Sequence, residues 1–227
     1  MDEEIFRKIR EIVEKEVSCS SHNMTHIDSV HNTCLLLAKG EKVDLDVLRA
    51  AALLHDIARV MEDSDPTGNT DHALLGAEIA APILEEARFS DEKIRHVQDC
   101  IITHRSRTDR KPQSLEAKIL FDADKLDSIG AVGLFRAIMW VGKHRAKIYD
   151  KTDKESVEKY IEANLGGKVN GRIQDKSRHS IQMDYVTKTR FLLEKLHTER
   201  AKEVGKERLE FFKAFIDRLE QEMRGEK

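Results

Sequence analysis

The sequence predicts an all-α protein, and three observations indicate this fold class. Apolar residues recur at helical spacing along most of the 227 residues, and few segments alternate with the period of two that strands require. Only three prolines are present. Hydrophobic residues make up 40%, charged residues 36% and aromatic residues 5% of the chain, proportions that suit a helical soluble protein. A chain of this length can bury a substantial core, so we expect a single domain over residues 1–227.

Charge and cysteine content exclude several classes of protein. The formal net charge is −3 and the two signs are mixed, so no basic face predicts binding to duplex nucleic acid. Cys19, Cys34 and Cys100 form no paired framework, which indicates reduced thiols. The charged residues 1–17 lack the apolar core of a secretory signal, and no apolar run approaches the roughly 18 to 20 residues that span a bilayer. We therefore expect a cytoplasmic protein without membrane contact.

Three helices are predicted in the first quarter of the chain. Residues 3–17 repeat apolar side chains at helical spacing, and the polar stretch "SCSSHN" can cap a second helix over 24–39, which Gly40 ends. The third helix is predicted over "KVDLDVLRAAALLHDIARVME", where one apolar stripe extends from Val47 to Met61. Its run of Ala and Leu predicts that this helix is buried on most sides.

Two loops and two helices follow. The turn-forming stretch "DSDPTGNTD" predicts a loop before a helix that begins at His72, and Pro82 is expected to kink that helix or split it. Ser90 can cap the next helix, which carries His104 on the same face as its apolar residues. "RSRTDRKPQS" predicts a second, basic loop.

The remaining chain predicts a central helical segment and a C-terminal extension. Residues 115–142 are apolar almost all round and are expected to lie at the centre of the fold. Residues 150–171 indicate a short helix and a loop, and amphipathic helices are predicted after His179. We expect the extension, about 150–227, to pack on the rest of the domain.

Side chains of the types that can bind metal ions lie on four separate predicted helices. They are His26, the pair His55 and Asp56, His104, and the aspartates of "FDAD", Asp122 and Asp124. Imidazole and carboxylate together suit Mn, Mg, Co, Ni, Fe or Zn rather than a thiolate site. A single helical histidine is more often a hydrogen-bonded core residue, so the prediction of a metal site depends on their joint occurrence.

The order of these residues resembles the HD superfamily of metal-dependent phosphohydrolases, and especially its small single-domain bacterial and archaeal members, which are similar to nucleotide pyrophosphohydrolases. The motifs that carry the resemblance extend over roughly residues 20–217 and are "SHNMTH", "ALLHDIAR", "HALLGAEIA", "IITHR", "AKILFDADKLDSIGAVGLFRA" and "ERAKEVGKERLEFFKAF". The resemblance implies a compact helical HD domain, with a metal-binding core at about 20–140 and additional C-terminal helices.

By this resemblance the metal ligands are His26, His55, Asp56 and one aspartate of "DAD". Asp122 and Asp124 lie about 200° apart on a helix, so one ion does not readily take both. Related proteins place the ligand after Ala in an "A-D-[KR]" pattern, which favours Asp124. Asp122 then accepts a hydrogen bond from one of the ligands or forms a contact between helices. Periodicity alone does not decide which of the two aspartates binds the metal.

The resemblance also implies roles around the substrate. His72 and His104 correspond to residues that face the substrate phosphate in mononuclear relatives and bind a second metal in binuclear ones. We favour one tightly bound ion, with these histidines facing phosphate or forming a weaker second site. Arg59 follows the HD pair and is expected to reach a phosphate, although a surface arginine fits equally well. Asp122 or Asp127 is a candidate acceptor for the proton of the attacking water.

The expected activity is hydrolysis of a phosphoanhydride or phosphoester bond, with a divalent ion as cofactor and a nucleotide as the small-molecule substrate. Pyrophosphate release from nucleoside triphosphates is favoured over nucleotidase activity. Cyclic-nucleotide phosphodiesterase activity is an alternative, against which the missing "GYP" motif counts. The other alternative is a regulatory or interaction module that keeps the metal or nucleotide site without turnover.

Overall fold

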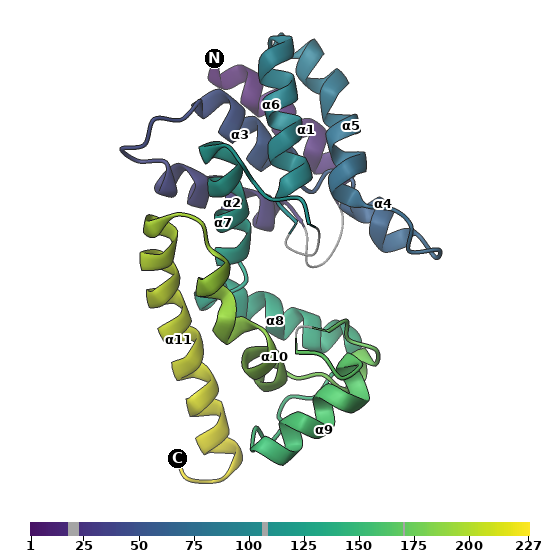
Figure 1. Cartoon of the computed structure of the whole chain (residues 1–227), viewed down its shortest axis with the longest axis vertical. Coiled ribbons are helices and arrows are strands. Elements are labelled where there is room, and N and C mark those ends of the chain that lie inside the picture. The colour runs from purple at the N-terminus through teal and green to yellow at the C-terminus, as the bar shows by residue number, and fades with distance from the viewer. Residues whose placement is uncertain (18–22, 106–108, 170) are drawn as a thin grey trace. The chain divides into compact units, whose positions relative to one another are not determined.

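The computed structural model describes residues 1–17, 23–105, 109–169 and 171–227, and within these ranges it contains helices and no strand (Figure 1). The predicted all-α fold class is therefore confirmed. Cys19 and His22 lie outside the described residues. No helix among the described residues is both long enough and apolar enough to cross a membrane.

Contacts within the chain separate two compact units, Met1–Asp124 and Lys125–Lys227. The expectation of one domain over residues 1–227 remains a prediction. The helices of the first unit are α1 (Glu3–Glu16), α2 (Met24–Leu37), α3 (Leu45–Leu54), α4 (Arg59–Ser64), α5 (His72–Glu86) and α6 (Asp91–Thr103). Helix α7 (Leu115–Leu126) begins in the first unit and ends two residues into the second.

Helix α3 lies at the centre of the first unit, where α1, α2 and α6 all pack against it. Every residue from Ala50 to Leu54 is buried, as the Ala and Leu run predicts. Asp44 caps the helix by accepting hydrogen bonds from the backbone N–H groups of Asp46 and Val47. The small side chains of Ala50, Ala51 and Ala52 let neighbouring helices approach closely, so α3 is held from several sides.

The predicted single helix through Met61 is wrong, because α3 ends at Leu54 and α4 begins at Arg59. Between them the backbone makes tighter turns, with Ile57 N–H donating to the Leu54 carbonyl at 3.1 Å and Arg59 N–H donating to the Asp56 carbonyl at 2.9 Å. The apolar stripe does not reveal this break, because Ile57 and Ala58 are buried in either conformation.

Pro82 does not split its helix, since α5 is continuous from His72 to Glu86. A proline removes one helical hydrogen bond, and burial of Ala77, Ala80 and Leu84 on both sides of it offsets that loss. Helix α5 packs most extensively on α6, which keeps the two helices together.

The second unit contains α8 (Gly130–His144), α9 (Lys154–Leu165), α10 (Ile181–Thr187), α11 (Glu199–Met223) and the 3₁₀ helices η1 (Lys176–Arg178) and η2 (Thr189–Lys195). Tyr160, Leu165 and Met183 form one buried cluster between α9 and α10. The apolar segment 115–142 is thus divided into α7 and α8, and Gly130 at the junction adopts a φ of 73° that favours glycine.

We expect Gly133→Ala to destabilise the protein strongly. A Cβ atom at Gly133 of α8 would lie 2.2 Å from the carbonyl carbon of Ser128 and 2.4 Å from its oxygen, and backbone cannot rotate away as a side chain can. The expected loss in the free energy of unfolding is at least about 2 kcal/mol, measured by urea unfolding.

Gly142→Ala in the same helix is the matched control, because nothing lies within 4 Å of the added Cβ. Alanine favours helix over glycine, so this variant is expected to gain up to about 1 kcal/mol. Equal effects of the two substitutions would contradict the packing at Gly133.

Candidate metal centre

His26 enters the site from the first turn of α2. The side chain of Asn23 caps this helix by accepting hydrogen bonds from the backbone N–H groups of Thr25 at 3.1 Å and His26 at 3.4 Å. Arg10 on α1 holds α2 through a bidentate pair with Asp28, at 2.7 and 3.0 Å. The His26 side chain is buried.

His55 and Asp56 follow directly after the buried helix α3. The imidazole of His55 is fully buried, and its Nδ1–H donates to the carbonyl oxygen of Ala52 at 2.9 Å. This hydrogen bond leaves Nε2 as the free ring nitrogen, which lies 3.3 Å from Nε2 of His26. Burial lowers the pKa of His55 to about 4, although Asp56 acts in the opposite direction, so the ring is neutral at neutral pH.

His72 and His104 come from helix ends that face each other. His72 is the first residue of α5, and His104 directly follows the last turn of α6, where its Nδ1–H donates to the Ile101 carbonyl oxygen at 2.6 Å. Their two Nε2 atoms lie 3.2 Å apart, and both side chains are buried.

Two groups of three residues bring their ligand atoms within 4.8 Å of one another. The first group is His26, His55 and Asp124, and the second is Asp56, His72 and His104. Within the first, Oδ1 of Asp124 lies 3.5 Å from Nε2 of His26. All six residues belong to the unit Met1–Asp124.

The carboxylate of Asp56 lies between the two groups and faces both. Its Oδ2 is 3.5 Å from Nε2 of His26 and 3.7 Å from Nε2 of His55. Its Oδ1 is 3.3 Å from Nε2 of His72 and 3.7 Å from Nε2 of His104. One buried carboxylate therefore contacts four imidazoles.

The proton positions in the second group favour a bound cation. Nδ1 of His72 donates to the carboxylate of Glu62, and burial lowers the pKa of His72, which favours the neutral ring. Its Nε2 then carries a lone pair, and the ring of His104, whose Nδ1–H donates to the Ile101 carbonyl oxygen, directs its own Nε2 to the same point. A cation bound by both nitrogens, which lie 3.2 Å apart, would satisfy them together.

The spacing of the donor atoms also suits a first-row divalent ion. Ligand atoms about 2.1 Å from such an ion are about 3.0 Å apart in octahedral and about 3.4 Å apart in tetrahedral coordination. The nearest contacts between the donor atoms, from 3.2 to 3.5 Å, are close to these values. The residues present therefore fit a divalent cation, and the donor set is imidazole and carboxylate as the sequence predicts.

Asp122 and Asp124 occupy different surroundings although both lie on α7. Asp124 belongs to the first group, whereas Asp122 is fully buried and belongs to neither group among the described residues.

Burial raises the pKa of Cys34 well above its usual value, with Cys100 and both aspartates adding to the effect. The Cys34 thiol is thus protonated and does not compete as a thiolate ligand.

Glu62 on α4 is a residue of this site that the sequence reasoning missed. It accepts hydrogen bonds from Nδ1 of His72, from Nη1 of Arg59 at 3.0 Å and from Nη2 of Arg105 at 2.8 Å. Burial by itself raises the pKa of Glu62, but the three cationic or donor neighbours outweigh it and hold that pKa below its usual value. An acidic residue in the charged stretch "RVMEDSD" resembles an ordinary surface carboxylate, so the sequence offered no signal for this role.

Arg59 lies beside the second group, and its guanidinium is held by carboxylates. Besides Glu62, it contacts Asp63, with Nη2 and Oδ1 3.3 Å apart. In the basic loop Arg105 and Arg110 both pair with Asp71, which caps α5, while Arg107 lies outside the described residues. These arginines are thus tied to acidic partners rather than simply solvated.

Asp127 is already engaged elsewhere. Its side chain is fully buried and forms an ion pair with Arg136 of α8. A buried charge is costly without a partner, so this pair is a structural contact within the second unit.

A family model and a curated relative match this chain. The family model of the HD domain matches residues 23–129, which include both groups of ligand atoms. YpgQ of Bacillus subtilis, an uncharacterised protein, is 25% identical over 206 residues, which cover 91% of this chain and 86% of YpgQ.

Two solved structures share the fold over nearly the whole chain. The crystal structure of Bacillus subtilis YpgQ in complex with ADP has a TM-score of 0.69 and 26% identity, covering 97% of this chain and 98% of that one. A predicted HD superfamily hydrolase from an uncultured Thermotogales bacterium has a TM-score of 0.62 and 27% identity, covering 96% and 92%. The family match identifies residues 23–129 as an HD domain, and the two structural neighbours, one of them a predicted HD superfamily hydrolase, share the fold over nearly the whole chain.

Proposed function

We propose that this chain is a metal-dependent phosphohydrolase that cleaves a phosphoanhydride or phosphoester bond of a nucleotide. The observation that carries the proposal is the convergence of four imidazole Nε2 atoms on the two oxygens of Asp56. A buried carboxylate surrounded by imidazole nitrogens that face one another is costly in a protein interior, and a divalent cation compensates this cost.

In this proposal His26, His55, Asp56 and Asp124 hold one divalent ion, and the second group, Asp56, His72 and His104, holds a further ion more weakly. A bound divalent ion supplies polarisation of a phosphoryl oxygen and activation of the attacking water. The second group contributes only three protein ligands among the described residues, one of which is shared, and this favours the weaker binding.

The chain's own residues then orient the phosphate. Nδ1–H of His72 is fixed by Glu62, and that of His104 by the Ile101 carbonyl, so both rings keep Nε2 directed to the centre of the site. Arg59 lies beside His72 and carries a planar guanidinium that suits phosphate oxygens. Glu62 and Asp63 already bind this guanidinium, so a substrate phosphate would meet it beside two carboxylates.

Asp122 is the remaining candidate for a proton acceptor or a support for the ligands. It is buried on the same helix as Asp124, two residues away, and Asp127 is unsuited because Arg136 already binds it. Ionised carboxylates near a cation accept protons from water that the cation acidifies.

One solved relative supports a nucleotide as the ligand of this site. YpgQ, which shares the fold over nearly its whole length, has been crystallised with ADP. The proposed order of preference is a nucleoside triphosphate with release of pyrophosphate, then a nucleoside monophosphate.

A phosphate-release screen with Mn, Co, Ni and Mg over tri-, di-, mono- and cyclic nucleotides tests this order. Bound metal without turnover on any substrate would instead support a regulatory module.

His55→Ala and Asp56→Ala are each expected to abolish turnover and to remove the tightly bound ion. His55 supplies a fully buried neutral Nε2, and Asp56 supplies both carboxylate oxygens that face the imidazoles. Metal content by elemental analysis and phosphate release on the same preparations are the measurements. Retained turnover in either variant would contradict the proposal.

His96→Ala is the matched control for these substitutions. His96 also lies in the first unit, on α6, but it pairs with Glu116 at 3.4 Å and belongs to neither group. We expect wild-type metal content and turnover, with thermal unfolding of each variant to verify that it is folded.

Glu62→Gln is expected to lower turnover and the affinity for a second equivalent of metal by about 10- to 100-fold, because it removes the charge that orients His72. Titration with Mn, followed by phosphate release, measures both quantities. Asp63→Asn is the control, since Asp63 contacts the same Arg59 but is not hydrogen-bonded to His72. If both variants lose activity to the same extent, the effect arises from Arg59 and the assigned role of Glu62 is wrong.

A further inference from the structure

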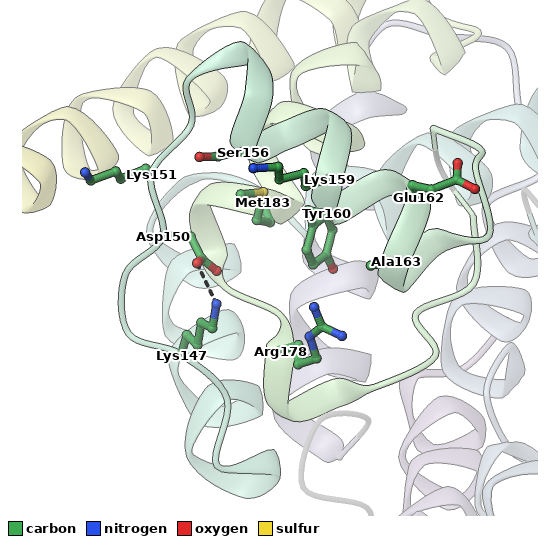
Figure 2. Close-up of a pocket in the computed structure, with 10 residues that line it drawn as sticks. All are labelled: Lys147, Asp150, Lys151, Ser156, Lys159, Tyr160, Glu162, Ala163, Arg178 and Met183. Carbon is green, nitrogen blue, oxygen red and sulfur yellow. Dashed lines mark hydrogen bonds and ion pairs between the residues drawn. The ribbon is translucent and has the colours of Figure 1, made fainter.

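The second unit contains a cavity of about 540 Å³ that none of the residues of the metal centre lines. Its walls are helix α9, the segment 147–151 that precedes it, and Arg178 and Met183 from η1 and α10 (Figure 2). Small-molecule sites in proteins have volumes of about 300 to 1,000 Å³, so this cavity is large enough for a metabolite.

The lining of this cavity is basic although the chain as a whole is acidic. Four basic and two acidic residues line it, which leaves a formal charge of +2, whereas the whole chain carries −3. Lys147 pairs with Asp150 at 2.8 Å, and Lys159 pairs with Glu155, which lies outside the lining. In the described ranges Arg178 forms no ion pair or hydrogen bond through its guanidinium, which Figure 2 shows directed toward Tyr160.

One carboxylate oxygen of the lining lacks a donor. Oδ1 of Asp150 accepts from Lys147, but Oδ2 is buried and has no hydrogen-bond partner among the described residues. A buried acceptor without a donor is costly. A hydroxyl or amine on a ligand in the cavity would supply the missing donor.

Tyr160 and Met183 form a fixed apolar wall. The hydroxyl of Tyr160 donates to Nδ1 of His179 at 2.5 Å, and Nε2 of His179 lies 3.5 Å from Oδ1 of Asp184. Burial raises the pKa of Tyr160 to about 12, so its hydroxyl stays neutral and keeps this hydrogen bond at neutral pH. The chain of hydrogen bonds holds the ring in one orientation, where it can contact the carbon skeleton of a ligand.

We propose that this cavity binds a small phosphate monoester, with Arg178 as the principal phosphate ligand and Asp150 as the acceptor for a hydroxyl or amine. A phosphate monoester carries about −1.5 to −2 charges at pH 7, which matches the +2 of the lining. A guanidinium without a carboxylate partner can bind two phosphate oxygens at once. The site is independent of the proposed hydrolytic reaction, because its residues lie in Lys125–Lys227 and those of the metal centre in Met1–Asp124.

The test is calorimetric titration of the full chain with AMP and with glucose 6-phosphate, in EDTA so that metal-dependent binding is suppressed. We expect saturable binding of one molecule per chain. Arg178→Ala is expected to weaken it at least about 10-fold, because a charge-assisted hydrogen bond is lost. Ala163→Trp, which alters no charge and places an indole among the lining residues, is expected to weaken it as well.

Arg172→Ala is the matched control, because Arg172 is an exposed arginine of the same segment that does not line the cavity. His55→Ala is the second control and is expected to bind like the wild type. Thermal unfolding verifies that each variant is folded. The proposal fails if neither phosphate monoester binds saturably, if Arg172→Ala weakens binding as much as Arg178→Ala does, or if His55→Ala abolishes the binding.

Discussion

The contacts between the buried carboxylate of Asp56 and four imidazoles are the interaction on which the arrangement of the first unit depends. This carboxylate is almost completely buried, and each of its oxygens faces two imidazoles at 3.3 to 3.7 Å. Burying a carboxylate is expensive unless cations or donors surround it. The buried helix α3 delivers Asp56 to this position, and α2, α5, α6 and α7 each bring one partner to the two groups. The helix packing that forms the first unit therefore also brings the residues of the site together.

The arginines beside the second group are held by acidic side chains of the first unit. Glu62, Asp63 and Asp71 hold Arg59, Arg105 and Arg110, so the arginines flanking the second group already have carboxylate partners. Partners of this kind orient a guanidinium and reduce its attraction for anions. A substrate phosphate therefore competes with protein carboxylates, and the free energy of that exchange contributes to its selection.

Much of the first unit could be predicted from the sequence, since the Ala and Leu run identified α3 as buried, and Asn23 of "SCSSHN" and Ser90 cap α2 and α6 as expected. Asp124, rather than Asp122, joins the first group, which the helical spacing could not decide. The break after Leu54 escaped prediction because buried apolar residues continue through it, and Glu62 escaped because its role depends on contacts with His72 and Arg105, distant in sequence.

Helix ends, rather than other side chains, orient two of the four imidazoles of this site. His55 and His104 each directly follow a helix and donate Nδ1–H to the carbonyl three residues earlier, in the last helical turn. Carbonyl oxygens at a helix end have capacity left for a side-chain donor, so the main chain itself selects the tautomer. Neighbouring side chains can then be replaced during evolution without rotating either ring. An insertion or deletion that shifts the end of α3 or α6 would instead abolish the site at once.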